Sequence, residues 1–145
     1  MLGLIQRVSE ASVLINQEVV GSISQGILAL IGIEKNDGEK QADRLLERII
    51  TYRIFEDENQ KMNLSLADIK GGLLLVPQFT LVADTKTGTR PGFSTAKSPE
   101  ESRELFEYLV KTAEKKYFSI ANGQFGAYMQ VTLCNDGPAT FLLQI

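Results

Sequence analysis

The chain has 145 residues, a formal net charge of −3 and a pI near 5.0, so we expect one domain that spans residues 1–145. It contains no histidine, which excludes Ser-His-Asp and Cys-His catalysis and any zinc site with a histidine ligand. The acidic balance argues against broad binding to DNA or RNA, which needs many phosphate contacts. It does not argue against a pocket that takes only the end of an RNA.

Membrane insertion and secretion are not expected. No apolar run approaches the ~18 residues of a membrane span. The first residues lack the basic start and the small-residue cleavage site of a signal peptide. The single cysteine, Cys134, cannot form an internal disulfide, and it is typical of a small buried hydrophobic residue in a reducing compartment. We therefore expect a cytoplasmic protein.

The N-terminal part of the chain has the pattern of strands. Strands are predicted at residues 2–9, 12–15 and 18–23, with Asn16-Gln17 as a tight turn. Residues 27–33 are almost wholly apolar, which is typical of a strand covered on both faces.

Two helices follow from the spacing of apolar residues and from their start signals. Residues 39–52 place their apolar side chains on one stripe, and Asp37 is a candidate cap for this helix. The second helix begins at Ser98, with Pro99 in its first turn and Glu101 completing a capping box.

The remaining segments complete the predicted fold. Residues 73–76 form a buried strand, and residues 83–97 form a long polar loop of a length that is often functional. Strands are predicted at 128–134 and 139–145, joined by a turn at 135–138. The fold class is therefore α+β, with a mostly antiparallel, barrel-like sheet and two main helices packed against it.

The segment after residue 76 is the first candidate site. Pro77 cannot donate a ladder hydrogen bond, so we expect the N–H groups just after it to be free for an oxyanion. Gln78 can both donate and accept hydrogen bonds, and Phe79 offers a face on which a base can stack. The alternative is that Phe79 belongs to the core and that Gln78 and Thr80 are ordinary surface residues.

Cations form a second candidate set. Lys86, Arg90 and Lys97 lie in or at the end of the long loop, and together with Arg7 they could meet phosphate or sugar. The alternative is a solvated loop with scattered charge. Gly137-Pro138 fits a hairpin turn on its residue types alone.

Two segments resemble the signatures of the D-aminoacyl-tRNA deacylase family, which are Ser-Gln-Phe-Thr-Leu and Asn-x-Gly-Pro-Val-Thr. This chain has Pro77-Gln78-Phe79-Thr80-Leu81 and Asn135-Asp136-Gly137-Pro138-Ala139-Thr140. The resemblance continues in order along nearly the whole chain. The further similar segments are Ile5–Val8, Ala11–Val13, Tyr52–Phe55, Lys61–Asn63, Arg90-Pro91, Phe93-Ser94 and Phe125–Ala127.

The resemblance implies a homodimeric editing enzyme. Such an enzyme hydrolyses the ester between a D-amino acid, or mischarged glycine, and the 3′ end of tRNA, and it rejects L-aminoacyl-tRNA. The tRNA 2′-hydroxyl would assist, and neither a cofactor nor a metal ion is expected. Gln78, Phe79 and Thr80 would line the catalytic pocket.

The second signature implies a role across the subunit interface. Gly137 and Pro138 would form a cis-proline motif that reaches into the partner's pocket and sets chiral selectivity. Arg7 would help to hold this motif, and Phe125 and Met129 would be neighbouring pocket residues by analogy.

Two departures from the family pattern leave alternatives open. Pro77 replaces a serine and Ala139 replaces a valine, and a sister family with Pro-Gln-Ala-Thr has relaxed chirality. Phe79 is retained, so the chain is closer to the D-specific family. The alternatives are a deacylase acting on a small L-aminoacyl-tRNA and a non-catalytic domain that binds RNA ends. Thr80 as a nucleophile would need a base, and none is visible nearby in the sequence.

Overall fold

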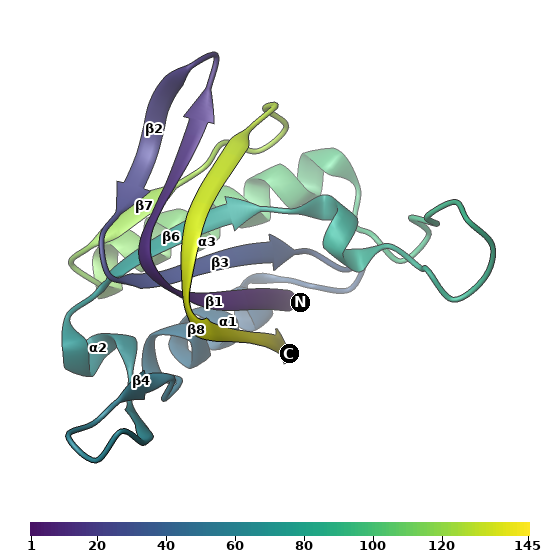
Figure 1. Ribbon diagram of the computed structural model, residues 1–145. Coiled ribbons are helices and arrows are strands. Elements are labelled where there is room, and N and C mark those ends of the chain that lie inside the picture. Colours follow the sequence, from purple (N-terminus) through teal and green to yellow (C-terminus); the bar gives the residue numbers. More distant parts are fainter.

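The computed structural model describes residues 1–145, and its strands form one bent, barrel-like mixed sheet with helices packed against it (Figure 1). The elements follow in the order β1 (Leu2–Ile15), β2 (Glu18–Ile23), β3 (Gly26–Gly32), α1 (Glu39–Thr51), β4 (Phe55–Glu56), β5 (Met62–Leu64), α2 (Leu66–Ile69), β6 (Gly72–Pro77), the 3-10 helix η1 (Phe79–Val82), α3 (Pro99–Lys116), β7 (Ile120–Asn122) and β8 (Gln130–Gln144).

The main sheet has the strand order β2-β1-β3-β6-β7, and β8 also pairs with β1. β1 is antiparallel to β2, β3 and β8. β3–β6 and β6–β7 are parallel pairs. The predicted α+β class with a barrel-like sheet and two main helices is confirmed. The β4–β5 hairpin and the one-turn helix α2 were not predicted.

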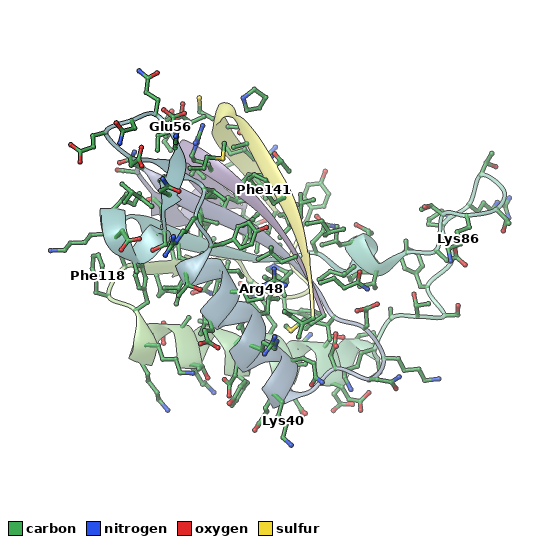
Figure 2. All side chains as sticks on the ribbon, turned by 90° about the horizontal axis from the view of Figure 1, so that it is seen from below. Lys40, Arg48, Glu56, Lys86, Phe118 and Phe141 are labelled. Atoms are coloured by element: carbon green, nitrogen blue, oxygen red, sulfur yellow. The ribbon has the colours of Figure 1, made fainter.

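β3 and β6 are covered on both faces, as the apolar run predicted. The buried odd-numbered residues of both strands belong to a core of 21 buried residues that includes α1 and α3. The even-numbered Leu28, Leu74 and Val76 belong to a second cluster of six residues, together with Val8 and Val13 of β1. Figure 2 shows α1 and α3 on one side of the sheet. The second cluster therefore fills the inside of the bend.

β1 and β8 are longer than predicted because they pair with each other around the bend. β1 continues through residues 10 and 11, and its two halves pair with β3 and with β2. Likewise, β8 passes through residues 135–138, where the prediction placed a hairpin turn. Val8 pairs with Asn135 and Gln6 pairs with Thr140. The extra residues of β8 thus form a bulge inside one strand.

Two smaller predictions were wrong. Gly38, not Asp37, is the N-cap of α1. The Asp37 carboxylate instead accepts hydrogen bonds from the Glu34 N–H at 2.6 Å and from the Met1 ammonium at 2.8 Å. Cys134 is exposed on β8 and is not a buried hydrophobic residue. Neither difference changes the helix or the strand to which the residue was assigned. None of the helices combines the length and the apolarity needed to cross a membrane.

Candidate functional site

The first candidate segment begins where β6 leaves the sheet. β6 pairs with β3 as far as Ile31 opposite Pro77, and the Gln78 N–H donates to the Ile31 carbonyl at 2.8 Å. The expectation of a free N–H directly after the proline is therefore wrong for Gln78. Alternate residues of a parallel strand bond to opposite neighbours, and on the other side β7 pairs only as far as Leu75. Pro77 therefore does not interrupt the hydrogen bonds between β6 and β3.

A short helix follows and carries the next two site residues. Phe79 and Thr80 open η1, so their N–H groups have no acceptor within that helix. Gly32 of β3 allows η1 to pack closely. A Cβ at that position would lie 2.9 Å from Cγ1 of Val82 and 3.1 Å from Cβ of Leu81. The sheet thereby holds two free N–H donors at a defined place.

The polar side chains of this segment bond to each other. The Gln78 amide Nε2 donates to the Thr80 hydroxyl, and Thr80 is exposed. No carboxylate or lysine is bonded to that hydroxyl. Thr80 therefore lacks the neighbouring base that a nucleophilic hydroxyl requires.

Two adjoining cavities meet at Phe79, Phe125 and Gly126. The larger has a volume of about 560 Å³ and lies between η1, the end of the long loop and the start of α3. The smaller, of about 270 Å³, lies between the end of β6 and the segment before β8. Phe93 faces Phe79 with a ring-centroid separation of 5.3 Å. The larger cavity is lined by Ile31, Ile33, Phe79, Phe93, Ala96, Lys97, Ser98, Pro99, Ser102, Phe125 and Gly126.

The smaller cavity brings four of the predicted site residues together. It is lined by Gln78 and Phe79 from one segment and by Phe125 and Met129 from another. The second segment is anchored by Gly123, whose N–H donates to the Leu75 carbonyl at 2.9 Å. The two predictions made by analogy, for Phe125 and Met129, thus concern residues at the same cavity.

Glycines shape the wall that carries these two residues. A Cβ on Gly123 would lie 2.7 Å from Met129 Sδ, so the missing side chain leaves room for the methionine. Gly126 has φ +78°, a left-handed conformation that favours glycine. The sequence predicted Phe125 and Met129 as pocket residues, but it did not predict the roles of Gly123 and Gly126.

The larger cavity has a charged rim on the α3 side. Lys97 lines the cavity, and its Nζ lies 3.9 Å from Glu101 Oε1. A hydrogen bond from the Ser98 side chain, with a smaller contribution from Lys97, holds the pKa of Glu101 below its usual value. The same serine caps α3 as predicted, since its Oγ accepts from the Glu101 N–H. Lys97 thus lies at the rim of the larger cavity.

The second candidate segment is a rigid bulge held by Arg7. Nε of Arg7 donates to the Asp136 carbonyl and Nη1 donates to the Ile54 carbonyl, both at 2.7 Å. Arg7 is only 8% exposed. Gly137 has φ +139°, and a Cβ there would lie 2.6 Å from Nη2 of Arg7. The Gly137-Pro138 peptide bond is cis.

A second set of hydrogen bonds closes the bulge. Asn135 Oδ1 accepts from the Ala139 N–H at 2.7 Å, and Asn135 Nδ2 donates to Thr140 Oγ1 at 2.8 Å. Ala139 is buried, whereas Gly137 and Pro138 are exposed. The bulge therefore presents Gly137 and Pro138 outward on a fixed frame.

The structure does not bring the two candidate segments together within one chain. Gly137, Pro138 and Arg7 line neither cavity. Sequence reasoning also missed residues that do line the cavities, namely Phe93, Tyr128 and the first turn of α3. Phe93 stood in a segment that was noted as similar to the family, but its ring gave no signal of contact with Phe79. No group of three or more acidic or cysteine side chains is arranged to hold a metal ion.

Comparisons with known proteins agree with the resemblance noted in the sequence. A family model described as D-Tyr-tRNA(Tyr) deacylase matches residues 4–144. The D-aminoacyl-tRNA deacylase of Pseudoalteromonas translucida (strain TAC 125) is 59% identical over 145 residues, covering 100% of both chains.

Solved structures agree as well. A structure named c-Myc DNA Unwinding Element Binding Protein superposes with a TM-score of 0.95 at 35% identity, covering 100% of this chain and 99% of that one. A structure titled as a probable eukaryotic D-amino acid tRNA deacylase superposes with a TM-score of 0.81 at 16% identity, covering 99% and 98%, which supports the fold alone. The full-length matches leave one conclusion: the chain belongs to the D-Tyr-tRNA(Tyr) deacylase family.

Proposed function

We propose that this protein hydrolyses the ester that joins a D-amino acid to the 3′-terminal adenosine of tRNA. The observation that carries the proposal is the placement, at the end of β6, of two N–H donors beside an aromatic cavity. Phe79 and Thr80 supply the N–H groups, and Phe79, Phe93 and Phe125 supply the aromatic walls. Membership of the family supports the same reaction.

The reaction needs little acid-base chemistry from the protein. An aminoacyl ester is already reactive, and water attacks its carbonyl carbon to form a tetrahedral intermediate. The N–H groups of Phe79 and Thr80 hydrogen-bond the oxyanion that develops there. The ester C–O bond then breaks, and the proton that the attacking water has lost passes to the leaving ribose 3′-oxygen with help from the neighbouring 2′-hydroxyl. The products are the free amino acid and uncharged tRNA, and the chain's lack of histidine is compatible with this route.

The aromatic walls suit the terminal base. Stacking of a base on an aromatic side chain contributes about 1–3 kcal/mol and is available to any base. Phe79 is 59% exposed, so one face of its ring is open to a ligand. Holding the adenosine in this way positions the ester next to Gln78 and the N–H groups.

We further propose that Gly137 and Pro138 complete the site of a second copy of the chain. They are exposed, they are held rigidly by Arg7 and Asn135, and they line neither of the two aromatic cavities of their own chain. Backbone carbonyls of the bulge would then bind the α-ammonium group. An L side chain would be directed at protein and a D side chain at open space. Glycine has no side chain to clash, so mischarged glycyl-tRNA is also a substrate.

Hydrolysis of matched esters tests the reaction. Purified, chelator-treated protein is given D-tyrosyl-tRNA, L-tyrosyl-tRNA and glycyl-tRNA side by side. We expect rapid loss of the D ester and the glycyl ester and no loss of the L ester above the rate in buffer. Equal loss of the D and L esters would contradict chiral selection and favour the relaxed alternative, for which L-alanyl-tRNA is the next substrate to test.

The role of Thr80 is tested separately. We expect the Thr80→Ala variant to keep a measurable rate, because the hydroxyl only hydrogen-bonds Gln78 and the N–H group remains. A complete loss of turnover, together with an acyl-enzyme trapped in the parent protein, would instead identify Thr80 as a nucleophile.

Mixing two defective variants tests the shared site. A Gln78→Ala/Phe79→Ala variant and a Gly137→Ala/Pro138→Ala variant are each expected to be nearly inactive. After unfolding and joint refolding, half of the dimers are mixed and each has one intact site, so about a quarter of the parent activity returns. A sedimentation mass equal to the monomer, or no recovery on mixing, would contradict the shared site.

A second candidate function rests on the structural relative with a TM-score of 0.95, which is named for binding a DNA element. This candidate is binding of a nucleic-acid end without hydrolysis. Retention of charged tRNA on a filter with no loss of any ester would favour it. For the proposed deacylase we also propose a cytoplasmic location, where charged tRNA is used and where an exposed free thiol such as Cys134 stays reduced.

A further inference from the structure

A protruding arm lies beside the aromatic cavities. We define the arm as residues 84–92. It is closed at its base by two reciprocal hydrogen bonds, from the Asp84 N–H to the Gly92 carbonyl at 2.8 Å and from the Gly92 N–H to the Asp84 carbonyl at 3.0 Å. Figure 1 shows the arm standing away from the body of the protein, and Figure 2 labels Lys86 on it.

The arm carries positive charge on an acidic protein. Lys86 and Arg90 are exposed and form no ion pair, whereas the whole chain has a net charge of −3. The only carboxylate of the arm, Asp84, accepts a hydrogen bond from the Lys86 N–H at 3.0 Å. The hydroxyl groups of Thr87 and Thr89 add exposed donors between the two cations. These cations and hydroxyl groups are suited to binding the phosphates of a nucleic-acid backbone.

The base of the arm is fixed relative to the site. Thr95 Oγ1 donates to the Val82 carbonyl at 2.7 Å, and the Lys35 N–H donates to the Thr95 carbonyl at 2.9 Å. Phe93, directly after the arm, faces Phe79 at 5.3 Å. The tip is open, since a Cβ on Gly88 would meet nothing within 4 Å. The base of the arm is thus fixed beside the cavity, and the two cations farther along the arm form no ion pair in the chain.

We propose that the arm binds the sugar-phosphate backbone of tRNA just upstream of the terminal adenosine. This inference rests on the proposed function and names a further contact of the same substrate. When the terminal nucleotide occupies the cavity, the preceding nucleotides must leave through its mouth as a chain of phosphates. Lys86 and Arg90 neutralise phosphates there, which adds affinity without reading the sequence.

The experiment compares two double variants on two substrates. Lys86→Ala/Arg90→Ala removes the two cations of the arm. Lys40→Ala/Lys61→Ala removes the same charge from α1 and from the β4–β5 hairpin, which lie away from the arm (Figures 1 and 2). Each variant and the parent are assayed on D-tyrosyl-tRNA and on 3′-O-D-tyrosyl-adenosine, which lacks the upstream phosphates.

The expected effect is confined to the long substrate. For two lost phosphate contacts, KM for D-tyrosyl-tRNA rises about tenfold in the arm variant, and the slope of log(kcat/KM) against log[salt] becomes shallower by about 1.5. We expect kcat to stay within about twofold, because the reacting groups are untouched. Turnover of 3′-O-D-tyrosyl-adenosine and all parameters of the control variant remain those of the parent.

Three outcomes overturn the inference in distinguishable ways. If the parent hydrolyses both substrates and the arm variant matches the control variant on tRNA, the arm proposal fails and the proposed function stands. If the arm variant is impaired on both substrates, or its sedimentation mass changes, the arm acts on the site or on a second copy and not on phosphates. If the parent hydrolyses neither substrate, the proposed function fails and the arm proposal falls with it.

Discussion

The two segments that resemble the family signatures differ in how the rest of the chain holds them. The segment at Gln78–Thr80 ends a buried strand, is exposed at Phe79 and Thr80, and borders two cavities of its own chain. The bulge at Gly137-Pro138 is locked by a buried arginine and an asparagine, yet it borders neither of these cavities. The first segment supplies an open surface on a stable strand, and the second supplies a rigid projection.

This difference separates stability from activity. Side chains of the Gln78–Thr80 segment make few contacts that hold the fold together, so their replacement should affect activity far more than folding. Arg7 and Gly137 are packed against each other, so their replacement should affect both. The predictions below are ordered from the largest expected effect to the smallest.

Replacing Arg7 should cause the largest loss of stability. Arg7→Met keeps most of the apolar stem but leaves the carbonyls of Ile54 and Asp136 without their donors. The Ile54 carbonyl is buried, whereas the Asp136 carbonyl is only partly buried. Leaving a buried acceptor unpaired costs about 1–3 kcal/mol, so we expect the free energy of unfolding to fall by about 3 kcal/mol, most of it from Ile54. Urea denaturation measures this. Arg44→Met, at an exposed position of α1, is the control and should stay within about 0.5 kcal/mol of the parent.

A value for Arg7→Met as small as that of the control would show that the bulge is not held by the arginine. In that case the contrast between a rigid and an open segment would break down.

Gly137→Ala should cause the next largest loss of stability. The new Cβ would lie 2.6 Å from Nη2 of Arg7 at a φ of +139°. We expect a loss of about 2 kcal/mol in the free energy of unfolding. Gly88→Ala separates the two causes, because Gly88 also has a positive φ, of +70°, but its Cβ would meet nothing within 4 Å. Equal losses for both variants would mean that contact with Arg7 is unimportant.

Phe79→Ala should change activity and hardly change stability. The ring is 59% exposed, so thermal unfolding should shift little. Loss of base stacking should lower kcat/KM for D-tyrosyl-tRNA by about tenfold. Phe118→Ala is the matched control, since Phe118 is 71% exposed and lines neither cavity. A large loss of stability in Phe79→Ala with unchanged kcat/KM would reverse our assignment of the two regions.

The smallest expected effect is a loss of the stability contributed by Glu101 at low pH. The pKa of Glu101 is lowered below its usual value of 4.5, first by the hydrogen bond from Ser98 and then by Lys97. Since the folded-state pKa is the lower one, this carboxylate stabilises the fold above about pH 4.5, and the contribution is lost as pH falls through the folded-state pKa. The gap in unfolding free energy between the parent and Glu101→Gln should therefore be present at pH 7 and should narrow below pH 4.5.

The bulge should not share this acid sensitivity, because Arg7 and Asn135 bond to backbone groups and to a hydroxyl, none of which titrates in that range. Denaturation curves of Arg7→Met at pH 7 and pH 4 should thus differ from the parent by the same amount. A gap that narrows in acid would point to a carboxylate partner of Arg7.

Local patterns in the sequence determined most of the helices and strands. They also identified some of the residues that line the cavities. The apolar run of β3, the stripe of α1 and the Ser98 cap of α3 arise from neighbouring residues, because burial and capping impose short periods and fixed spacings. The missing histidine and the two family segments were likewise visible without a structure. These features pointed to a deacylase-like site at Gln78, Phe79 and Thr80.

Only the tertiary structure decided how distant segments meet. Phe79, Phe93 and Phe125 come from three separate segments, and their placement around one cavity depends on β6 pairing with β3 and β7. The predicted turn at residues 135–138 became a bulge because β8 keeps pairing with β1 on both sides of it. Such long-range pairing is set by the packing of the whole sheet, which leaves no period in the sequence from which it can be read.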